Sequence, residues 1–343
     1  MAIDWAAGYE VAYWRIRRVD PATWASGDDL ARVDSASVSR SCGGNLEEGS
    51  ITVTVDPAFE PEAGWYRTEM LAVQGARSEL ATLSTMHYEP GALSQPHAYS
   101  GWQMTMPGSS ALSWASERLA RFRPVPMFVR AGEDGAQRVA EMLRACSPAP
   151  VVVHGGFAVA SDVVFGPEST ALDCCWQLVD AAGWCMQVDG MGIVHVMPQP
   201  TEPSLEMDLL ALQPNRTPPG TGRPNVLYVV DGTAGAVVVV NDDPASPNSV
   251  QRRGRRIELC EEDPIRIEGE TLADYAKRRL RELGSDVVTY DYTREYWPGV
   301  LPYGIVRARV APGAQPVDLR VSSQTLALGR GVTVQETVTQ RLE

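Results

Sequence analysis

The chain contains almost no lysine and no long apolar run. Lys277 is the only lysine among the 30 basic residues of this 343-residue chain. No apolar run approaches the roughly 18 residues that a membrane-spanning helix requires. The N-terminal residues also lack the basic and apolar segments of a signal peptide. We therefore expect no membrane anchor, no export signal and reduced thiols for the six cysteines.

Motifs for nucleophilic and nucleotide-dependent catalysis are also missing. His154 begins a His-Gly-Gly sequence like the oxyanion loop of esterases. Those enzymes need a Gly-x-Ser-x-Gly elbow after this loop. The nearest candidate, residues 108–112 around Ser110, comes before it and lacks the second glycine. A phosphate-binding loop is excluded because Lys277 follows Ala276 rather than glycine.

Metal-binding spacings are absent as well. There is no Cys-x-x-Cys and no His-Glu-x-x-His in the chain. Cys175, Cys185 and His195 are evenly spaced but lack a fourth ligand, and none of the four histidines has an evident partner. The sequence therefore predicts no catalytic residue, no cofactor and no metal site, and so a protein that is not an enzyme.

The composition is that of an acidic globular protein. Hydrophobic residues make up 44% of the chain, which is too many for a disordered protein. The net charge is −13, whereas proteins that wrap nucleic acid or bind anionic membranes usually carry positive charge. We therefore expect no specific nucleic-acid binding. The 30 glycines and 25 prolines favour many short strands and turns.

Residues 1–106 are rich in strand signals. Residues 51–55 alternate strictly between apolar and polar, which is typical of a half-buried strand. Pro-Gly turns occur at residues 90–91 and 107–108. No stretch keeps a helical period beyond two turns. We expect a first β-barrel-like domain here.

Residues 107–200 instead predict an α+β module of two helices and a hairpin. Asp134 is a candidate helix N-cap, because apolar residues follow it at helical spacing. A second helix is expected to begin at Ser169 and to end at Gly183. The strand-like runs on either side of residues 189–192 then predict a hairpin.

The rest of the chain divides into a linker and a second β-rich region. Residues 201–224 are rich in proline and predict a stiff, extended linker. Residues 225–343 return to strands, with one helix that Thr271 caps and Gly284 ends. The predicted fold is therefore α+β and β-rich, with two small antiparallel β-barrel-like domains and the α+β module between them.

The densest charge feature is a run of four arginines, Arg252, Arg253, Arg255 and Arg256, which acidic residues follow directly. Three interpretations stay open: a solvated strand edge, a contact between subunits and a nucleic-acid patch. The acids that follow cancel most of the field at long range, which argues against nucleic acid. Arginine binds carboxylates through paired hydrogen bonds, so these four residues are candidate contacts between subunits.

Three stretches of the chain carry a pattern that goes beyond composition. The first runs from Trp14 to Trp24 and continues with residues 38–40 and 49–55. The second, residues 169–200, combines a capped helix, a Gly-Trp pair and an Asp-Gly hairpin. The third runs from Pro224 through Asn-Asp-Asp-Pro, Ser-Pro-Asn-Ser and Arg-Gly-Arg-Arg to the expected helix. Together they resemble the hub proteins of bacteriophage tails, which form the central ring of baseplates and tail tips.

The resemblance implies a structural protein of the virion tail. Hubs of this family are homotrimers of a chain with two related barrel-like domains, and the ring joins the six-fold tail tube to the three-fold tip. The implied partners are further copies of the chain, a distal tail or tail-tube protein, the tape-measure protein and a tip or fibre protein. DNA passes through such a ring without specific binding, and assembly takes place in the host cytoplasm. Longer relatives append a cell-wall-degrading domain, for which we expect no room here.

Other functions stay open beside this one. The hub of a bacterial contractile injection system would have the same fold. A receptor- or glycan-binding tail module would need exposed aromatic residues gathered on one face, whereas the nine tryptophans are scattered along the chain. The missing motifs disfavour an envelope hydrolase.

Overall fold

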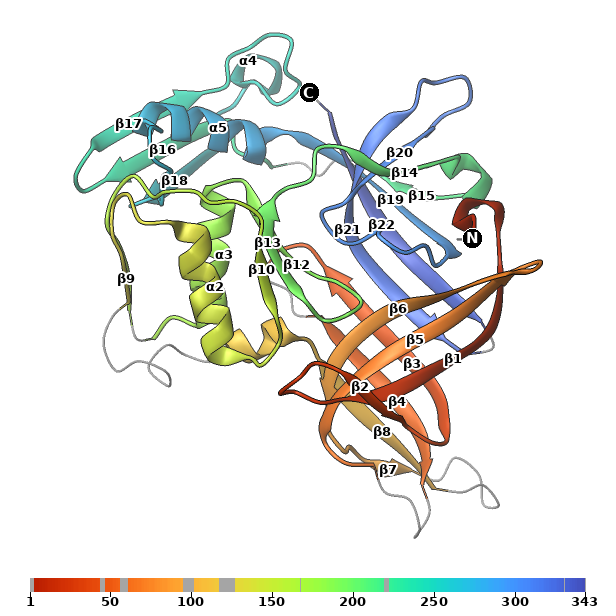
Figure 1. The fold of residues 1–343 in the computed structure, drawn as a ribbon. Helices are drawn as coiled ribbons and strands as arrows, with labels where there is room; N and C mark the ends of the chain where they lie inside the picture. The colour runs from red at the N-terminus through yellow and green to blue at the C-terminus, as the bar shows by residue number, and fades with distance from the viewer. Residues whose placement is uncertain are drawn as a thin grey trace.

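The protein is β-rich, and its longer helices lie to one side of a large sheet (Figure 1). The computed structural model describes residues 3–43, 47–55, 61–94, 102–116, 127–166, 168–218, 222–329 and 331–342. The predicted β-rich α+β class is confirmed. Within these ranges, no helix has both the length and the apolar character needed to cross a membrane.

The N-terminal strands form one half of the large sheet, after a short 3-10 helix, η1 (Trp5–Ala7). They are β1 (Glu10–Val19), β2 (Ser26–Asp29), β3 (Val33–Ser41), β4 (Glu48–Val55), β5 (Gly64–Gln74), β6 (Arg77–Tyr88), β7 (Leu93–Ser94) and β8 (Trp102–Ser109). The predicted alternation in β4 is confirmed, because Ile51, Val53 and Val55 are buried and the threonines between them are half-buried.

The C-terminal strands form the other half and pair directly with the first. They are β14 (Pro203–Met207), β15 (Asn215–Thr217), β19 (Asp286–Glu295), β20 (Ile305–Ala308), β21 (Val317–Leu328) and β22 (Val332–Leu342), with the 3-10 helix η3 (Leu209–Leu212) after β14. Strand β21 runs antiparallel to β3, from Ser323 opposite Ser41 to Leu328 opposite Ala36. This pairing joins the two halves into one sheet.

The sheet stays open in the described part of the chain. Its order runs β15-β19-β22-β21-β3-β4-β8-β6-β5-β1-β2, with β20 beside β21, β14 beside β20 and β7 beside β8. The two barrel-like domains therefore stay a prediction, as do the domain boundaries. Strands β14 and β15 lie inside the expected linker, residues 201–224, and pair with β20 and β19. Proline is compatible with this because Pro203 is the first residue of a peripheral strand.

The predicted α+β module contains the expected helices and hairpin. Its elements are η2 (Ala111–Ser116), β9 (Met127–Val129), α2 (Gly135–Cys146), β10 (Val151–Val153), β11 (Val163–Phe165), α3 (Ala171–Ala181), β12 (Trp184–Val188) and β13 (Val194–Pro198). Asp134 caps α2, with Oδ1 accepting the Ala136 N–H at 2.9 Å. Thr170, one residue later than expected, caps α3. Gly183 follows α3 with a φ of +67°, as predicted.

Residues 226–284 form a second α+β unit with its own small sheet. Its elements are β16 (Val226–Asp231), β17 (Gly235–Val240), α4 (Val250–Arg253), β18 (Glu258–Glu262) and α5 (Leu272–Gly284). The strand order is β17-β16-β18, and α5 packs on one face of this sheet. Thr271 caps α5, as predicted. The expected second β domain, residues 225–343, thus contributes strands to two separate sheets.

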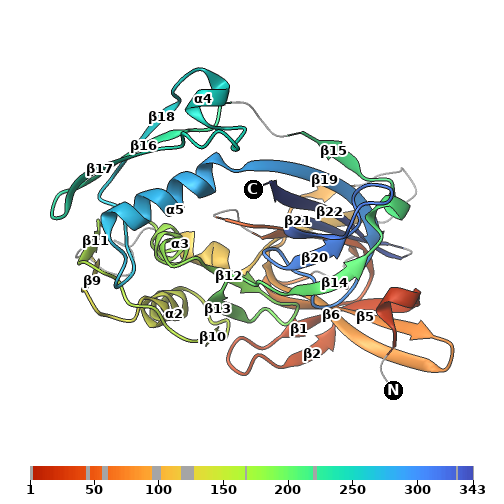
Figure 2. The same cartoon turned by 90° about the horizontal axis from the view of Figure 1, so that it is seen from above.

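This second unit rests on the module. Figure 2 shows α5 between its own sheet and α3. Arg278 of α5 donates a hydrogen bond to the Ala181 carbonyl at the end of α3, at 3.3 Å. Val159 also forms an antiparallel β-bridge with Ile267. These contacts fix the unit against the helices of the module.

The turn between β12 and β13 attaches the module to the large sheet. Thr85 Oγ1 donates to the Gly190 carbonyl at 2.9 Å, and Trp24 Nε1 donates to the Met191 carbonyl at 2.7 Å. The approach is so close that a Cβ at Gly190 would overlap the carbonyl oxygen of Thr82. Glycine is therefore required where the turn meets β6.

Candidate functional site

The four arginines singled out in the sequence lie in and after α4. We call them the α4 arginine cluster: Arg252, Arg253, Arg255 and Arg256. Ser249 caps the helix, and its Oγ accepts the Arg252 N–H at 3.3 Å. Gly254 ends the helix in the left-handed region, with a φ of +64°. This glycine separates the two pairs of arginines.

The α4 arginine cluster is open to solvent. Three of its side chains are exposed, and that of Arg253 is half-buried. Arg252 Nε donates to the Pro244 carbonyl at 2.8 Å. Within the described ranges, no Asp or Glu oxygen lies within 4.0 Å of any of the four guanidinium groups. The cluster therefore presents positive charge that no acidic side chain in the described part of the chain neutralises by direct contact.

Two buried asparagines hold the segment that carries the cluster. Asn225 is fully buried; its Nδ2 donates to the Arg255 carbonyl at 3.0 Å, and its Oδ1 accepts the Ile257 N–H at 2.7 Å. Asn248 is 2% exposed and donates to the Pro224 carbonyl at 2.9 Å. Both asparagines belong to the motifs that carry the resemblance. Their hydrogen bonds fix the path of the chain before and after α4.

The structure brings together two histidines that the sequence left without partners. His154 Nε2 lies 2.9 Å from His195 Nδ1, and His195 Nε2 lies 3.2 Å from Asp189 Oδ2. An acid that orients a histidine is also part of a catalytic triad. In the described part of the chain, however, no serine or cysteine side chain is hydrogen-bonded to His154. Ser110, from the incomplete elbow, is fully buried.

The two cysteines considered as metal ligands are fully buried. Cys175 Sγ faces the Val139 carbonyl oxygen at 3.9 Å inside the core of the module. Burial raises the pKa of Cys175 well above its ordinary value and that of Cys185 to about 12, so both thiols stay protonated. Among the described residues, no group of three or more His, Cys, Asp or Glu is placed to hold a metal ion.

Comparisons of sequence found no relative. No protein-family model matches the chain. No curated protein matches it either. Any relationship must therefore be read from the fold.

Comparisons with solved structures found the same fold along almost the whole chain. A tail protein from Neisseria meningitidis has a TM-score of 0.65 at 11% identity, with 97% of this chain and 96% of that chain covered. The 43 kDa tail protein of prophage MuSo2 from Shewanella oneidensis has a TM-score of 0.62 at 12% identity, with 95% and 97% covered. The prophage tail protein gp18 from Listeria monocytogenes has a TM-score of 0.54 at 11% identity, with 95% and 94% covered. The resemblance to phage tail proteins drawn from the sequence is thus confirmed at the level of the fold, and the chain has the fold of bacteriophage tail proteins.

Proposed function

We propose that this chain is a structural protein of a phage tail, the hub whose three copies form a ring between the tail tube and the tip. The single observation that carries the proposal is the end-to-end match with the Neisseria meningitidis tail protein, in which 97% of this chain finds an equivalent. A match over the full length involves both halves of the large sheet and both α+β units. In the proposed ring, the two halves of the sheet act as the two related barrel-like domains of one subunit.

The proposed partners are those of a hub at the end of a tail. They are further copies of the chain, a distal tail or tail-tube protein, the tape-measure protein and a tip or fibre protein. The proposed location is the virion tail, after assembly in the host cytoplasm. The role is non-enzymatic, and the surroundings of Cys175 and His154 described above are consistent with it.

The trimer is tested by mass photometry of the purified chain and by electron cryo-microscopy of intact tails. The expected result is a ring with three-fold symmetry at the end of the tail tube. A monomer or dimer at this position in an intact particle contradicts the proposal. If the chain is found instead in a bacterial injection apparatus, the ring stands and the assignment to a phage fails.

The part played by the α4 arginine cluster is tested by replacing its four members with glutamine. We expect normal circular dichroism, because these side chains are open to solvent, but weaker ring formation that depends on salt. The control replaces four other exposed arginines that have no ion pair within the described ranges, namely Arg77, Arg130, Arg216 and Arg309. Both variants change the net charge equally, so equal assembly in the two would mean that the cluster is only a solvated surface.

A further inference from the structure

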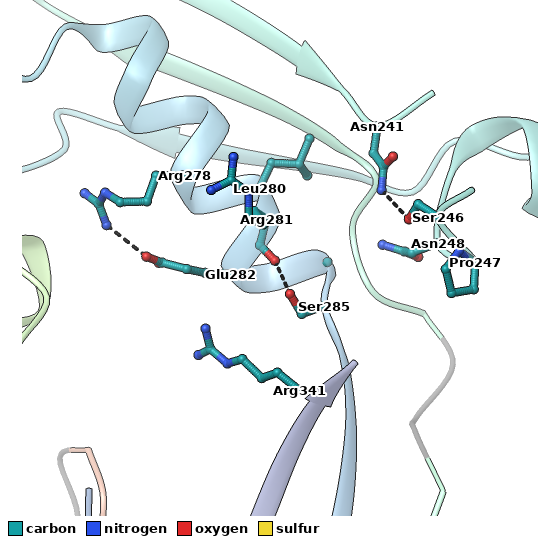
Figure 3. Close-up of a pocket in the computed structure, with 11 residues that line it drawn as sticks. Asn241, Ser246, Pro247, Asn248, Arg278, Leu280, Arg281, Glu282, Ser285 and Arg341 are labelled. Carbon is teal, nitrogen blue, oxygen red and sulfur yellow. Dashed lines mark hydrogen bonds and ion pairs between the residues drawn. The ribbon is translucent and has the colours of Figure 1, made fainter. Parts of the chain in front are cut away.

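A basic pocket lies where α5, the loop before α4 and the end of β22 meet (Figure 3). Its volume is about 530 Å³. Neutral polar side chains of Asn241, Ser246 and Ser285 line one part of it. In Figure 3, Arg341 extends from β22 below the last turn of α5. The pocket is thus shared between the second α+β unit and the large sheet.

Two arginines of this pocket have no acidic partner among the described residues. Arg278, on the same helix, is bound to Glu282 at 3.1 Å and to Glu270 at 2.8 Å. Arg281 and Arg341 are exposed, and within the described ranges neither makes an ion pair. The pocket therefore offers two guanidinium groups that no acid of the described ranges neutralises, and guanidinium groups bind a carboxylate well. A singly charged carboxylate also suits the pocket better than a phosphate dianion, because Glu282 lies in its wall.

The opposite end of the same unit carries a rigid acidic corner. Strand β18 ends at Glu262, about 13 Å along the strand from its first residue. Glu262 is exposed and makes no ion pair within the described ranges. The next residue, Asp263, has a φ of +46° and is held by two hydrogen bonds, from the Gly232 N–H at 2.9 Å and to the Val230 carbonyl at 2.7 Å. The corner is thus held by hydrogen bonds and carries an exposed carboxylate that makes no ion pair with the described residues.

Other charged residues at the two ends leave the end with the pocket basic and the end with Glu262 acidic. Asp242, Asp243 and Glu258 are exposed near the pocket, but the α4 arginine cluster lies there too. At the acidic end, Arg266 is bound to Asp231 at 2.9 Å, and Arg279 is bound to Glu261 at 3.0 Å. The unit is therefore basic at one end and acidic at the other, in a chain whose net charge is −13.

We propose that the basic pocket receives the Glu262 carboxylate of a second copy of this chain. The proposal rests on the ring described under Proposed function and names the surfaces that close it. A contact between two different surfaces of identical chains is heterologous, and such contacts generate closed rings when the rotation permits. Opposite charges at the two ends favour this head-to-tail arrangement over a contact between two like ends.

Charge reversal tests the pairing directly. Arg281→Glu and Glu262→Arg are each expected to raise the concentration for half-maximal assembly at least about tenfold, because each places like charges opposite one another. The double variant restores opposite charges and is expected to recover assembly. Arg309→Glu and Glu89→Arg, both at exposed positions without ion pairs in the described ranges, are the matched controls. Mass photometry at low and high salt measures all five proteins and the unaltered chain.

The outcomes separate this proposal from the proposed function. If the unaltered chain forms rings and the single reversals assemble like the controls, the pocket does not mediate the contact, but the proposed ring is still supported. If both single reversals lose assembly but the double variant does not recover it, the pairing with Glu262 is wrong. If the unaltered chain forms no ring even in intact particles, the proposed function itself fails. The pairing is supported if both single reversals weaken assembly and the double variant recovers it.

Discussion

The buried ion pair between β19 and β22 gives the sharpest test of what stabilises the large sheet. Arg294 Nε and Nη2 donate to the Glu336 carboxylate at 2.6 and 3.1 Å. Tyr292 and Gln324 donate to the same carboxylate at 2.9 and 2.8 Å. The side chain of Arg294 is 2% exposed and that of Glu336 is fully buried. Burial raises the pKa of Tyr292, so its hydroxyl keeps the proton that it donates.

The change Glu336→Gln keeps the shape of this side chain but removes its charge. Arg294 then stays buried without a counter-ion. The new amide N–H₂ group also faces hydrogen-bond donors at a place where the carboxylate oxygen accepted their hydrogen bonds. Removing one partner of a buried pair costs about 3–5 kcal/mol, because the other charge is left in a medium that solvates it poorly. We expect the free energy of unfolding in urea, followed by tryptophan fluorescence, to fall by this amount. Urea is chosen because guanidinium would screen the charges.

An exposed pair provides the matched control. Arg307 and Asp318 also face each other across neighbouring strands, β20 and β21, with two hydrogen bonds of 2.7 and 3.0 Å. Their side chains are 40% and 42% exposed, so Asp318→Asn is expected to cost no more than about 1 kcal/mol. Replacing both Arg294 and Glu336 with apolar residues is expected to recover most of the loss. If Glu336→Gln and Asp318→Asn cost the same, burial does not govern the strength of these pairs and the reasoning is refuted.

Two further predictions concern the contact between the module and the large sheet. Gly190→Ala is expected to cost about 1–3 kcal/mol and to speed proteolysis of the module, because its Cβ would overlap the Thr82 carbonyl. Gly232→Ala is the control, because its Cβ would make only an ordinary contact, at 3.6 Å, with Asp263 Oδ1. Equal losses of stability in the two variants would contradict the prediction. Burial raises the pKa of Glu47 from its ordinary 4.5 to about 7, although Arg40 opposes the shift. Between these pH values the folded state keeps a proton that the unfolded state has lost. The free energy of unfolding therefore falls as the pH rises from 4.5 to 7. From pH 5 to pH 8, the free energy of unfolding in urea should fall by about 2–3 kcal/mol more for the unaltered chain than for the Glu47→Gln variant. If the free energies of the two proteins differ by the same amount at every pH, the prediction is refuted.

The sequence predicted well those elements that local signals determine. Asp134 and Thr271 were identified as helix caps because a cap needs only a short polar side chain beside its own helix. The hairpin of β12 and β13 was predicted for the same reason, since the turn lies between the two strands that it joins. The start of α3 was placed one residue early because Ser169 and Thr170 are both good caps. Here the local sequence holds almost all of the relevant information.

The candidate site was only partly visible in the sequence. The α4 arginine cluster was found because its residues are close together in the sequence. The hydrogen bonds that connect Asp189, His195 and His154 were missed. About forty residues separate His154 from His195, and only the parallel pairing of β10 with β13 brings them together. The basic pocket was missed for the same reason, since Arg281 and Arg341 come from different ends of the C-terminal region.

The sequence by itself determined the β-rich class, the principal helices and the resemblance to tail hubs, because composition, caps and periodicity are properties of neighbouring residues. Only the tertiary structure decided which strands pair. Strand β3 meets β21 from the far end of the chain, and β14 and β15 leave the expected linker to join the same sheet. An alternating pattern says which face of a strand is buried but not which strand lies beside it. The burial of the pair Arg294 and Glu336 follows from that pairing, because each residue taken alone is typical of a solvated surface.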